Sequence, residues 1–368
     1  MQEIRLGMIG CGQISTRFFD QAAKLEGIRF VATCAAHEES ARAKATERGC
    51  AHWYTDYNQL LADAEVDAVV ITTPHQLHAR MAAAAVRAGK HVLVEKPMAT
   101  RWTEARELVA AAEEAGKVLM ALPFVHYPSL TTALDYAREE YIGKITGAEA
   151  ELNIPGPPRS NWYYSAEAEG GAMLDTIVYP LGRVAALMGP AKRVTAFVNR
   201  LIPHRLTGDG GHVNSEVDDN VTILLEYATG QQAVVRSLWA QSFAQNGTVL
   251  HGRHGAIFLG RFGQELVVKS DLKPVPGARP IEYLGLTNCY VPDIPKLPVE
   301  QDLVGHFVDC IRTGKTPRPS AAIGLHIAEQ QQMAYESAKS GRAIDLTTSF
   351  GVWWDREPEI MRLDTGWL

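Results

Sequence analysis

The sequence predicts a two-domain chain: an α/β domain with a doubly wound parallel sheet at residues 1–122, and an α+β domain with a large, mostly antiparallel open sheet at residues 123–368. Strand-like and helical patterns alternate in the first part, as they do when helices connect parallel strands. Runs with a period of two dominate the second part, which is typical of antiparallel strands with one solvated face. A chain of 368 residues also exceeds what one hydrophobic core usually supports.

The elements of the first part follow one another as strand and helix. The expected strands are Ile4–Ile9, Arg29–Cys34, Trp53–Tyr54, Asp67–Thr72, His91–Glu95 and Val118–Leu122. The expected helices are Ile14–Leu25, Glu38–Arg48, Tyr57–Ala62, His75–Ala88 and Thr103–Ala115. Because parallel strands joined by helices require right-handed crossovers, these elements predict helices on both faces of one sheet.

The second part mixes helices with longer alternating strands. The expected helices are Leu130–Tyr141, Gly170–Met188, Val299–Thr313 and Ala321–Ser340. The expected strands are Thr146–Ile154, Arg193–Ile202, Asn220–Tyr227 and Gln231–Ala240, with shorter runs to about Tyr283. The last two long strands are separated by Ala228-Thr229-Gly230, which indicates a hairpin. We therefore expect a largely antiparallel sheet.

The composition argues against several classes of partner. The net charge is −6 and no long basic run occurs, so neither nucleic acid nor an anionic membrane is expected as a partner. No apolar stretch has the length of a membrane span, and the first strand begins without a signal-peptide pattern. The five cysteines form no CxxC pair, which argues against a disulfide framework and a zinc site. A cytoplasmic location is the simplest expectation.

The turn after the first strand has the pattern of a dinucleotide site. Gly10 permits a tight turn, and Gly12 lets the backbone approach a pyrophosphate. Gln13 and Ile14 lead into a helix whose N-terminus offers free N–H groups. Ser15 replaces the usual third glycine; it is small enough for helix–strand packing, and its hydroxyl could bond a phosphate. We therefore predict a Rossmann domain that binds a nicotinamide dinucleotide, the alternative being a structural turn.

The end of the second strand bears on the choice between NAD and NADP. An acidic residue commonly stands there and holds the adenosine ribose. This chain has Ala35, Ala36 and His37 instead, so no carboxylate would repel a 2′-phosphate. His37 could donate to that phosphate, and Arg42 could reach it from the helix. NADP is therefore slightly favoured over NAD, although His37 is almost equally well interpreted as an exposed residue at a helix start.

A second candidate segment follows the fourth strand. Thr73 and Pro74 stand at the sheet edge where open α/β sheets bind ligands, and proline there can start the next helix. His75 and His78 lie on about one face of that helix. No third ligand accompanies them, so we assign them to cofactor contact rather than to a metal, with plain helix surface as the alternative.

A third candidate segment, Glu95-Lys96-Pro97, ends the fifth strand. The carboxyl end of this strand lies at the same edge of the sheet as the glycine turn. Packing explains poorly why a lysine should stand between Glu95 and Pro97. We therefore assign Glu95 and Lys96 to the cofactor site, and Lys96 also to the chemistry beside the cofactor.

Taken in this order and spacing, the motifs resemble those of the Gfo/Idh/MocA family, named for glucose–fructose oxidoreductase and inositol dehydrogenase. They are Gly10-Cys11-Gly12-Gln13-Ile14, Thr73-Pro74, Glu95-Lys96-Pro97, Gly170-Gly171-Ala172-Met173-Leu174-Asp175, Tyr179, and the closing segment with Pro317-Arg318-Pro319 and His326. The resemblance covers nearly the whole chain. It implies a Rossmann domain and a C-terminal domain whose open sheet often builds dimers or tetramers. It also implies hydride exchange between NAD(P) and a sugar, polyol or related molecule.

The family resemblance also assigns roles. The family's catalytic lysine falls on Lys96 and its helix acid on Asp175. Many members have histidine four residues later, whereas this chain has Tyr179, as in the branch that contains dihydrodiol and xylose dehydrogenases. The stretch Pro123–Pro128 departs from the family pattern, which puts the usual contacts from this loop in doubt; His126 could substitute for them.

The residues themselves suggest how a proton would move. Asp175 and Tyr179 are spaced i, i+4, so they share a face of the expected helix Gly170–Met188. A hydride leaving an alcohol carbon requires a base, and a phenol with a pKa of about 10 needs a nearby ammonium to act as one. Lys96 can supply that charge, with Asp175 as the orienting group. The alternative makes Lys96 itself the acid or base, and the sequence does not separate the two.

Other residues are candidates for substrate contact. Trp162 and Tyr163 lie just before the expected catalytic helix and could stack on a sugar ring; a hydrophobic plug is the alternative. His126 and His326 complete the expected substrate-binding set, together with Lys96, Asp175 and Tyr179.

Together, the motifs and the family resemblance predict an NAD(P)-dependent enzyme, a dehydrogenase or reductase of a neutral sugar, sugar derivative or polyol. Few arginines are placed to clamp a carboxylate, which favours a neutral substrate. One alternative is a redox-assisted enzyme that cleaves glycosides or epimerises sugars and retains its cofactor. Another is a non-enzymatic dinucleotide-binding sensor. We expect no metal, no nucleic acid and no membrane partner, and a homodimer or homotetramer formed through the C-terminal sheet.

Overall fold

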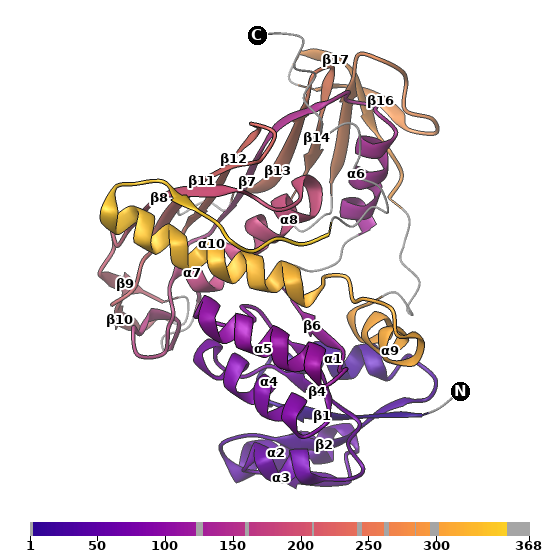
Figure 1. Cartoon of the computed structure of the whole chain (residues 1–368), viewed down its shortest axis with the longest axis vertical. Helices are drawn as coiled ribbons and strands as arrows, with labels where there is room; N and C mark the ends of the chain where they lie inside the picture. Colours follow the sequence, from indigo (N-terminus) through magenta and orange to yellow (C-terminus); the bar gives the residue numbers. More distant parts are fainter. Residues whose placement is uncertain are drawn as a thin grey trace. The chain divides into compact units, whose positions relative to one another are not determined.

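The computed structural model describes residues 3–122, 128–158, 162–207, 210–240, 245–260, 265–283, 285–294 and 302–351. The chain forms two compact units (Figure 1). Unit 1 comprises Met1–His126 and Leu297–Ala328, and unit 2 comprises Tyr127–Lys296 and Glu329–Leu368. This differs from the expected single division after residue 122, because a late segment of the chain returns to the first core.

Unit 1 is built on a six-stranded parallel sheet of order β3-β2-β1-β4-β5-β6. Its strands are β1 (Ile4–Ile9), β2 (Ile28–Cys34), β3 (His52–Tyr54), β4 (Ala68–Ile71), β5 (His91–Val94) and β6 (Leu119–Ala121). Its helices are α1 (Ser15–Ala22), α2 (Glu38–Arg48), α3 (Tyr57–Ala62), the short η1 (His75–Leu77), α4 (His78–Arg87) and α5 (Trp102–Glu114). The doubly wound sheet predicted from the sequence is confirmed.

Two apolar cores cover the two faces of this sheet. On one face, side chains of α4 and α5 pack with alternate residues of β4 and β5. On the other face, Phe18 of α1 packs with Leu303, Val304 and Phe307 of α9 (Leu303–Thr313). The amphipathic face of α9 therefore completes the core of unit 1, which explains why this late helix belongs there rather than to unit 2.

Unit 2 contains a ten-stranded sheet of order β16-β17-β15-β14-β13-β7-β12-β11-β8-β18. Its strands are β7 (Ile145–Asn153), β8 (Arg193–Asn199), β11 (Asn220–Glu226), β12 (Gln232–Leu238), β13 (Gln245–Gly252), β14 (Gly255–Leu259), β15 (Leu266–Ser270), β16 (Arg279–Tyr283), β17 (Leu286–Val291) and β18 (Ile344–Asp345). β7 and β12 pair in parallel, and the other described pairs are antiparallel. The expected large, mostly antiparallel sheet is confirmed, as is the hairpin of β11 and β12.

Helices and a small hairpin complete unit 2. They are α6 (Pro128–Arg138), η2 (Trp162–Tyr164), α7 (Ala172–Asp175), α8 (Val178–Met188), most of α10 (Ala321–Ser340), and the hairpin of β9 (His204–Leu206) and β10 (His212–Asn214). α8 packs against β7, β12 and β13. Val221, Ile223 and Leu225 of β11 are buried, whereas Leu224 points to the opposite, open face of the sheet.

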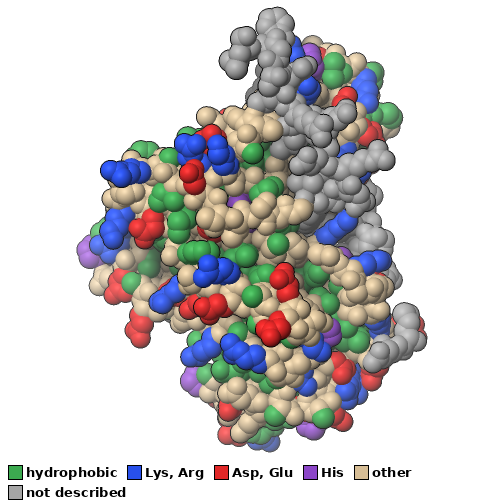
Figure 2. Space-filling view, in the orientation of Figure 1, with side chains coloured by type: hydrophobic (Ala, Val, Ile, Leu, Met, Phe, Trp, Pro, Cys, Tyr) green, Lys and Arg blue, Asp and Glu red, His purple; other side chains and the backbone are tan. Residues whose placement is uncertain are grey.

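Charges of both signs are distributed over the described part of the face that Figure 2 shows. In Figure 2, Lys and Arg side chains lie among Asp and Glu, without a large area of one sign on the face shown. Among the described residues, no helix is both long and apolar enough to cross a membrane.

Candidate active site

The turn between β1 and α1 is fixed by backbone contacts. Gly10 has φ of +100°, and a Cβ on it would lie 2.7 Å from the carbonyl carbon of Thr72. Its N–H donates to the Cys34 carbonyl at 2.8 Å, and its own carbonyl accepts from the Thr72 hydroxyl at 2.7 Å. Gly10 therefore ties the ends of β1, β2 and β4 together at a spacing that only glycine allows.

The backbone that follows this turn is open. A Cβ on Gly12 would meet nothing within 4 Å. Gly12, Gln13 and Ile14 are exposed, and the Ile14 side chain retains 52% of its accessible surface. α1 begins at the next residue, so its N-terminal dipole end faces this open backbone. Such an arrangement leaves room for a pyrophosphate and favours its negative charge.

Ser15 serves the packing role that its size suggested. The residue is fully buried, and its hydroxyl donates to the Gly12 carbonyl at 2.6 Å. The proton of this hydroxyl is used inside the turn, and the predicted bond of Ser15 to a phosphate stays a prediction.

The end of β2 presents charges of both signs. Ala35 is half-buried, and His37 is an exposed N-cap residue of α2 with an extended backbone. Glu38 and Glu39 occupy the first turn of α2, and both line an open surface pocket together with Arg42. His37 and Arg42, the basic residues predicted to face a 2′-phosphate, therefore stand beside two carboxylates that were not part of that prediction.

The loop after β4 carries an unused polar group. The hydroxyl oxygen of Thr73 is buried and has no hydrogen-bond partner among the described residues. Pro74 precedes η1, and His75, the first residue of η1, is 3% exposed. A buried hydroxyl at the carboxyl edge of a parallel sheet is a natural partner for a polar group of a bound cofactor.

His78 faces backbone carbonyls of its own chain, and its predicted contact with the cofactor stays a prediction. Its Nδ1 faces the Pro97 carbonyl at 2.8 Å, its Nε2 faces the Thr73 carbonyl at 2.7 Å, and the residue is 1% exposed. Burial lowers the pKa of this imidazole, although both hydrogen bonds act to raise it. A neutral imidazole donates to one of these two carbonyls and contacts the other, so His78 links the loop after β4 to the loop after β5.

Lys96 stands at the end of β5, between β4 and β6 in the sheet. It is half-buried, and its backbone N–H donates to the Glu95 carboxylate at 2.9 Å. The Glu95 carboxylate thus fixes the turn at which the Lys96 side chain leaves the strand. Lys96 therefore lies at the same edge of the unit 1 sheet as the Gly10 turn.

Asp175 and Tyr179 do not lie on one continuous helix, contrary to the prediction. α7 ends at Asp175 and α8 begins at Val178. The N–H groups of Thr176 and Ile177 both donate to the Ala172 carbonyl, at 3.1 and 2.9 Å, so the helical hydrogen-bond ladder is interrupted there. The i, i+4 rule therefore does not set the relative direction of Asp175, which is 7% exposed, and the half-buried Tyr179.

Two glycines allow α7 to start where it does. A Cβ on Gly170 would lie 2.1 Å from the Tyr163 carbonyl oxygen, and one on Gly171, whose φ is +103°, would lie 2.8 Å from the Asp218 carboxylate. That carboxylate accepts from the Met173 N–H at 2.7 Å and from the Tyr335 hydroxyl at 2.5 Å. Burial raises the pKa of Asp218. Asp218 therefore caps α7, a role that no sequence motif indicated.

The aromatic residues before α7 divide into two kinds. Tyr164 is 2% exposed, and its hydroxyl donates to the Pro157 carbonyl at 2.7 Å, so it plugs the core. Trp162 and Tyr163 are half-buried and stack on each other with ring centroids 3.8 Å apart. Their contact with substrate stays a prediction. His326 is fully buried in α10, and its predicted role is likewise untested; His126 lies outside the described residues.

The donor set of unit 1 fits a dinucleotide better than a metal. Gly12 offers an open backbone, α1 a helix N-terminus, and Thr73 a buried hydroxyl that lacks a partner in the described chain. Within the described residues, no group of three or more His, Cys, Asp or Glu side chains could hold a metal ion. The fold and this site define an oxidoreductase with an NAD-binding Rossmann domain.

Comparison with protein families makes the assignment specific. Residues 4–122 match the model of an oxidoreductase family with an NAD-binding Rossmann fold, and residues 130–258 match the GFO/IDH/MocA C-terminal domain. The chain belongs to the Gfo/Idh/MocA family. The resemblance inferred from its motifs is thereby confirmed.

Individual relatives are enzymes that act on sugars. The chain is 34% identical to the dTDP-3,4-didehydro-2,6-dideoxy-α-D-glucose 3-reductase of Actinomadura kijaniata over 61% of this chain and 68% of the relative. It is 31% identical to the 1,5-anhydro-D-fructose reductase of Ensifer adhaerens over 70% of this chain and 75% of the relative. The solved structure of levoglucosan dehydrogenase in complex with NADH and L-sorbose has a TM-score of 0.82 at 22% identity, covering 95% of this chain and all of that one.

Sequence reasoning missed the side chains that hold unit 2 together around α7. Thr176, Arg205, Asp219 and Trp239 are all buried and joined by hydrogen bonds. They come from the α7–α8 break, the middle of β9, the start of β11 and the end of β12, and none belongs to a recognisable motif. The adjacent acids Asp218-Asp219 were the one available signal, because two carboxylates at a strand start require partners if they are buried.

Proposed function

We propose that this protein transfers a hydride between NAD(P) and a hydroxyl or carbonyl carbon of a neutral sugar, sugar derivative or polyol. The observation that carries the proposal is Lys96, which stands at the carboxyl edge of a dinucleotide-type sheet. The sugar reductases among its relatives support the substrate class. Bound NAD(P) would accept or supply the hydride; the chain must bind the substrate and move the hydroxyl proton.

Three side chains take part in moving the hydroxyl proton in the proposed mechanism. Tyr179 accepts or donates it, the ammonium of Lys96 stabilises the phenolate and bonds the reacting oxygen, and Asp175 orients its partners. In the alternative assignment, Lys96 is itself the acid or base. Asp175 ends α7 and Tyr179 lies at the start of α8. Because the helix is interrupted between them, their side chains are not bound to one helix face, which supports different roles for the two residues.

The test is turnover by the purified full chain, followed as absorbance of the reduced nicotinamide. The compounds are 1,5-anhydro-D-fructose, levoglucosan, pyranoses and inositols, each with both dinucleotides. Lys96→Met should lower kcat/KM by about 10³-fold and change dinucleotide affinity by less than about threefold. Lys315→Met, at an exposed position, is the matched control. Full activity of Lys96→Met would refute the role of Lys96, and no turnover on any compound would contradict the function.

The pH profile separates the two assignments. If Tyr179 moves the proton, Tyr179→Phe removes the limb of the kcat/KM profile that belongs to the phenol. If Lys96 moves it, Tyr179→Phe retains both limbs. A retained profile would assign the acid–base role to Lys96.

We also propose NADP(H) as the preferred cofactor. The support is the absence of a carboxylate at Ala35–His37, together with His37 at the N-cap of α2 and Arg42 within that helix. Fluorescence titration of cofactor-stripped protein should show tighter binding of NADPH than of NADH, and Arg42→Ala should remove the difference. Tighter NADH would show that Glu38 or Glu39 dominates this site.

The proposed oligomer is a homodimer or homotetramer formed through the open sheet face. Phe197, Leu224 and Val234 lie on that face and are 72%, 41% and 36% exposed. They occupy the neighbouring strands β8, β11 and β12. An apolar patch of this kind marks an interaction surface. Light scattering should report a multiple of the chain mass, which Phe197→Glu should reduce; a monomeric wild-type chain would refute the proposal.

A cytoplasmic location completes the proposal. All five cysteines are free, which fits a reducing compartment. Fractionation of the producing cells should recover the protein with the cytoplasmic markers, and recovery in another fraction would contradict it.

A further inference from the structure

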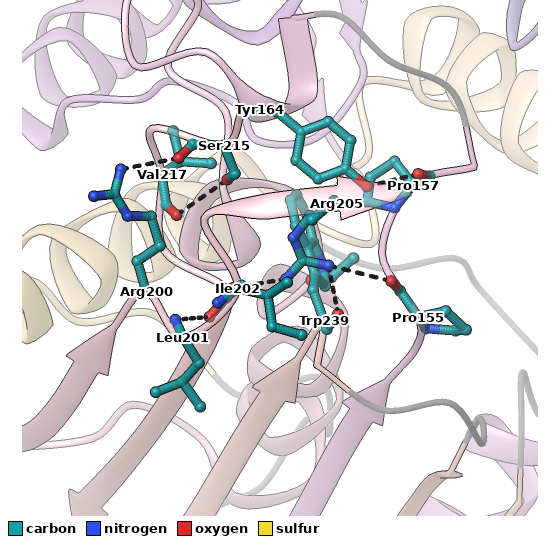
Figure 3. A network of polar contacts seen from close by, with 12 residues as sticks. Pro155, Pro157, Tyr164, Arg200, Leu201, Ile202, Arg205, Ser215, Val217 and Trp239 are labelled. Atoms are coloured by element: carbon teal, nitrogen blue, oxygen red, sulfur yellow. Dashed lines mark hydrogen bonds and ion pairs between the residues drawn. The ribbon is translucent and has the colours of Figure 1, made fainter. Parts of the chain in front are cut away.

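A buried polar network in unit 2 connects two segments that carry candidate residues. The first is the aromatic loop, defined as residues 155–158 and 162–164, and the second is the α7–α8 break at Thr176. Figure 3 shows Arg205 and Tyr164 lying close to Trp239, with hydrogen bonds from this group to the loop carbonyls of Pro155 and Pro157.

Thr176 is the polar centre of the helix break. Its hydroxyl oxygen accepts from the indole Nε1–H of Trp239 at 2.8 Å and lies 2.6 Å from the Ser237 hydroxyl. Ser237 in turn donates to the Leu152 carbonyl at 3.1 Å. All three side chains are nearly inaccessible to solvent. Side chains from β12 and its end therefore hold the break, together with the bonds that Thr176 makes to the Ala172 carbonyl of α7.

Trp239 extends the contact from the break to the loop. Its backbone N–H donates to the Asp219 carbonyl at 2.7 Å, and its own carbonyl accepts from Arg205 Nη1 at 2.7 Å. Its ring meets the Tyr164 ring edge-on, with centroids 5.7 Å apart. A single residue thus touches the break, the buried arginine and the aromatic loop.

Arg205 joins the loop to a buried ion pair. Its Nη2 donates to the Asp219 carboxylate at 2.7 Å, with 5% and 0% of the two side chains exposed. Its Nη1 also donates to the Pro155 carbonyl at 3.3 Å. Asp219 accepts further hydrogen bonds from the N–H groups of Leu201 and Ile202, whereas the buried Nε of Arg205 has no partner among the described residues.

The aromatic loop packs closely against this network. A Cβ on Gly156, whose φ is +101°, would lie 2.9 Å from the Tyr164 hydroxyl and 3.1 Å from Arg205 Nη1. Burial raises the pKa of Tyr164; the Arg205 cation lowers it and the Asp175 carboxylate raises it. The same phenol therefore responds to the ion pair and to the candidate acid of α7.

We propose that Trp239 is a positioning residue for the reaction. Through Thr176 it sets the directions in which Asp175 and Tyr179 leave the helix break, and through Arg205 and Tyr164 it holds the aromatic loop in register with them. The kinetic part of this inference rests on the proposed function, whereas the physical coupling of loop and break does not.

Hydrogen exchange tests the coupling without any substrate. Trp239→Phe removes the indole donor and keeps an aromatic ring, and Thr176→Val removes the hydroxyl and keeps the shape. In both variants, exchange of peptides covering residues 162–171 and 172–180 should accelerate together by about tenfold. Thr248→Val is the matched control, because its hydroxyl is equally buried and has no partner among the described residues. Acceleration confined to residues 172–180 would overturn the coupling.

Kinetics distinguishes positioning from simple stabilisation. Thr176→Val should lower kcat by about tenfold and shift the pH profile of kcat/KM, with dinucleotide KM changed less than about twofold, whereas Thr176→Ser should restore both. A Thr176→Val enzyme with unchanged kcat and pH profile would overturn the positioning role. If the wild-type chain turns over no compound, the proposed function fails, and the exchange result alone decides the inference.

Discussion

The candidate residues of the two units are held in place by different means. In unit 1, the Gly10 turn is built from backbone hydrogen bonds among strand ends, and glycine is needed for the approach to Thr72. In unit 2, the α7–α8 break is held by the side chains of Trp239, Ser237 and Thr176. A backbone-built site leaves a local signature in the sequence, because it restricts residue size and φ at fixed spacing. A network of side chains from distant segments leaves none.

The difference also concerns how each unit tolerates buried charge. In the loops described for unit 1, the histidines His75 and His78 are buried, and burial lowers the pKa of His78, which favours its neutral form. In unit 2, Arg205 and Asp219 are buried as an ion pair. Losing one member of such a pair leaves an uncompensated charge, so we expect unit 2 to be the more sensitive to single polar substitutions.

The largest expected effect is on the buried ion pair. Arg205→Met should lower the free energy of unfolding by about 3–5 kcal/mol, because the Asp219 carboxylate would remain buried without its cation. Urea unfolding followed by circular dichroism measures this change. Arg193→Met is the control: its pair with Asp345 is exposed and should contribute less than about 1 kcal/mol. Equal losses in the two variants would remove the contrast.

The next effect separates two roles of glycine in unit 1. Gly10→Ala should cost about 2–4 kcal/mol of stability, because its φ is +100° and the methyl group would collide with Thr72. Gly12→Ala should leave stability within about 0.5 kcal/mol, since no atom lies within 4 Å of its Cβ position. It should still weaken dinucleotide binding by at least about tenfold, because the methyl group occupies space left for the pyrophosphate. Thermal unfolding and fluorescence titration test both; unchanged affinity in Gly12→Ala would contradict the assignment.

A third effect concerns a carboxylate that fixes the end of unit 2. Glu329 is 2% exposed and accepts hydrogen bonds from the N–H and hydroxyl groups of both Thr347 and Thr348, which lower its pKa despite burial. Its contribution is therefore present above its ordinary pKa of 4.5 and is lost as pH falls through the lower folded value. Glu329→Gln should cost about 1–3 kcal/mol at neutral pH, and the difference should shrink in acid. A pH-independent difference would contradict this account.

The smallest effect is the acid response of unit 1. The pKa of buried His78 lies below its ordinary value of 6.5, so acidification below 6.5 protonates the unfolded chain first. Stability should fall as pH decreases from 6.5 toward the folded pKa, and this part of the slope should be absent in His78→Gln. Chemical unfolding in steps between pH 7.5 and about 5 measures the slope. His37→Gln, at an exposed position, should leave it unchanged.

The features that the sequence did not predict share one cause. The helix predicted over Gly170–Met188 is interrupted at Thr176, where the N–H groups of Thr176 and Ile177 share the Ala172 carbonyl and the Thr176 hydroxyl accepts from the indole of Trp239. The sequence around His78 is the same whether its imidazole faces solvent or two backbone carbonyls, so the sequence does not predict its burial. The amphipathic pattern of α9 predicts that one face of the helix is buried, but it does not indicate which of the two cores covers that face. In each case, the deciding contact lies far away in the sequence.

By itself, the sequence determined the doubly wound sheet, the glycine turn, the placement of Lys96 at a strand end and the family. These properties follow from local periodicity and from residues whose spacing is fixed by backbone geometry. Only the tertiary structure decided the break between Asp175 and Tyr179, the burial of His78 and the network of Arg205, Asp219 and Trp239. Burying polar groups requires partners, and those partners are brought together only when distant segments pack.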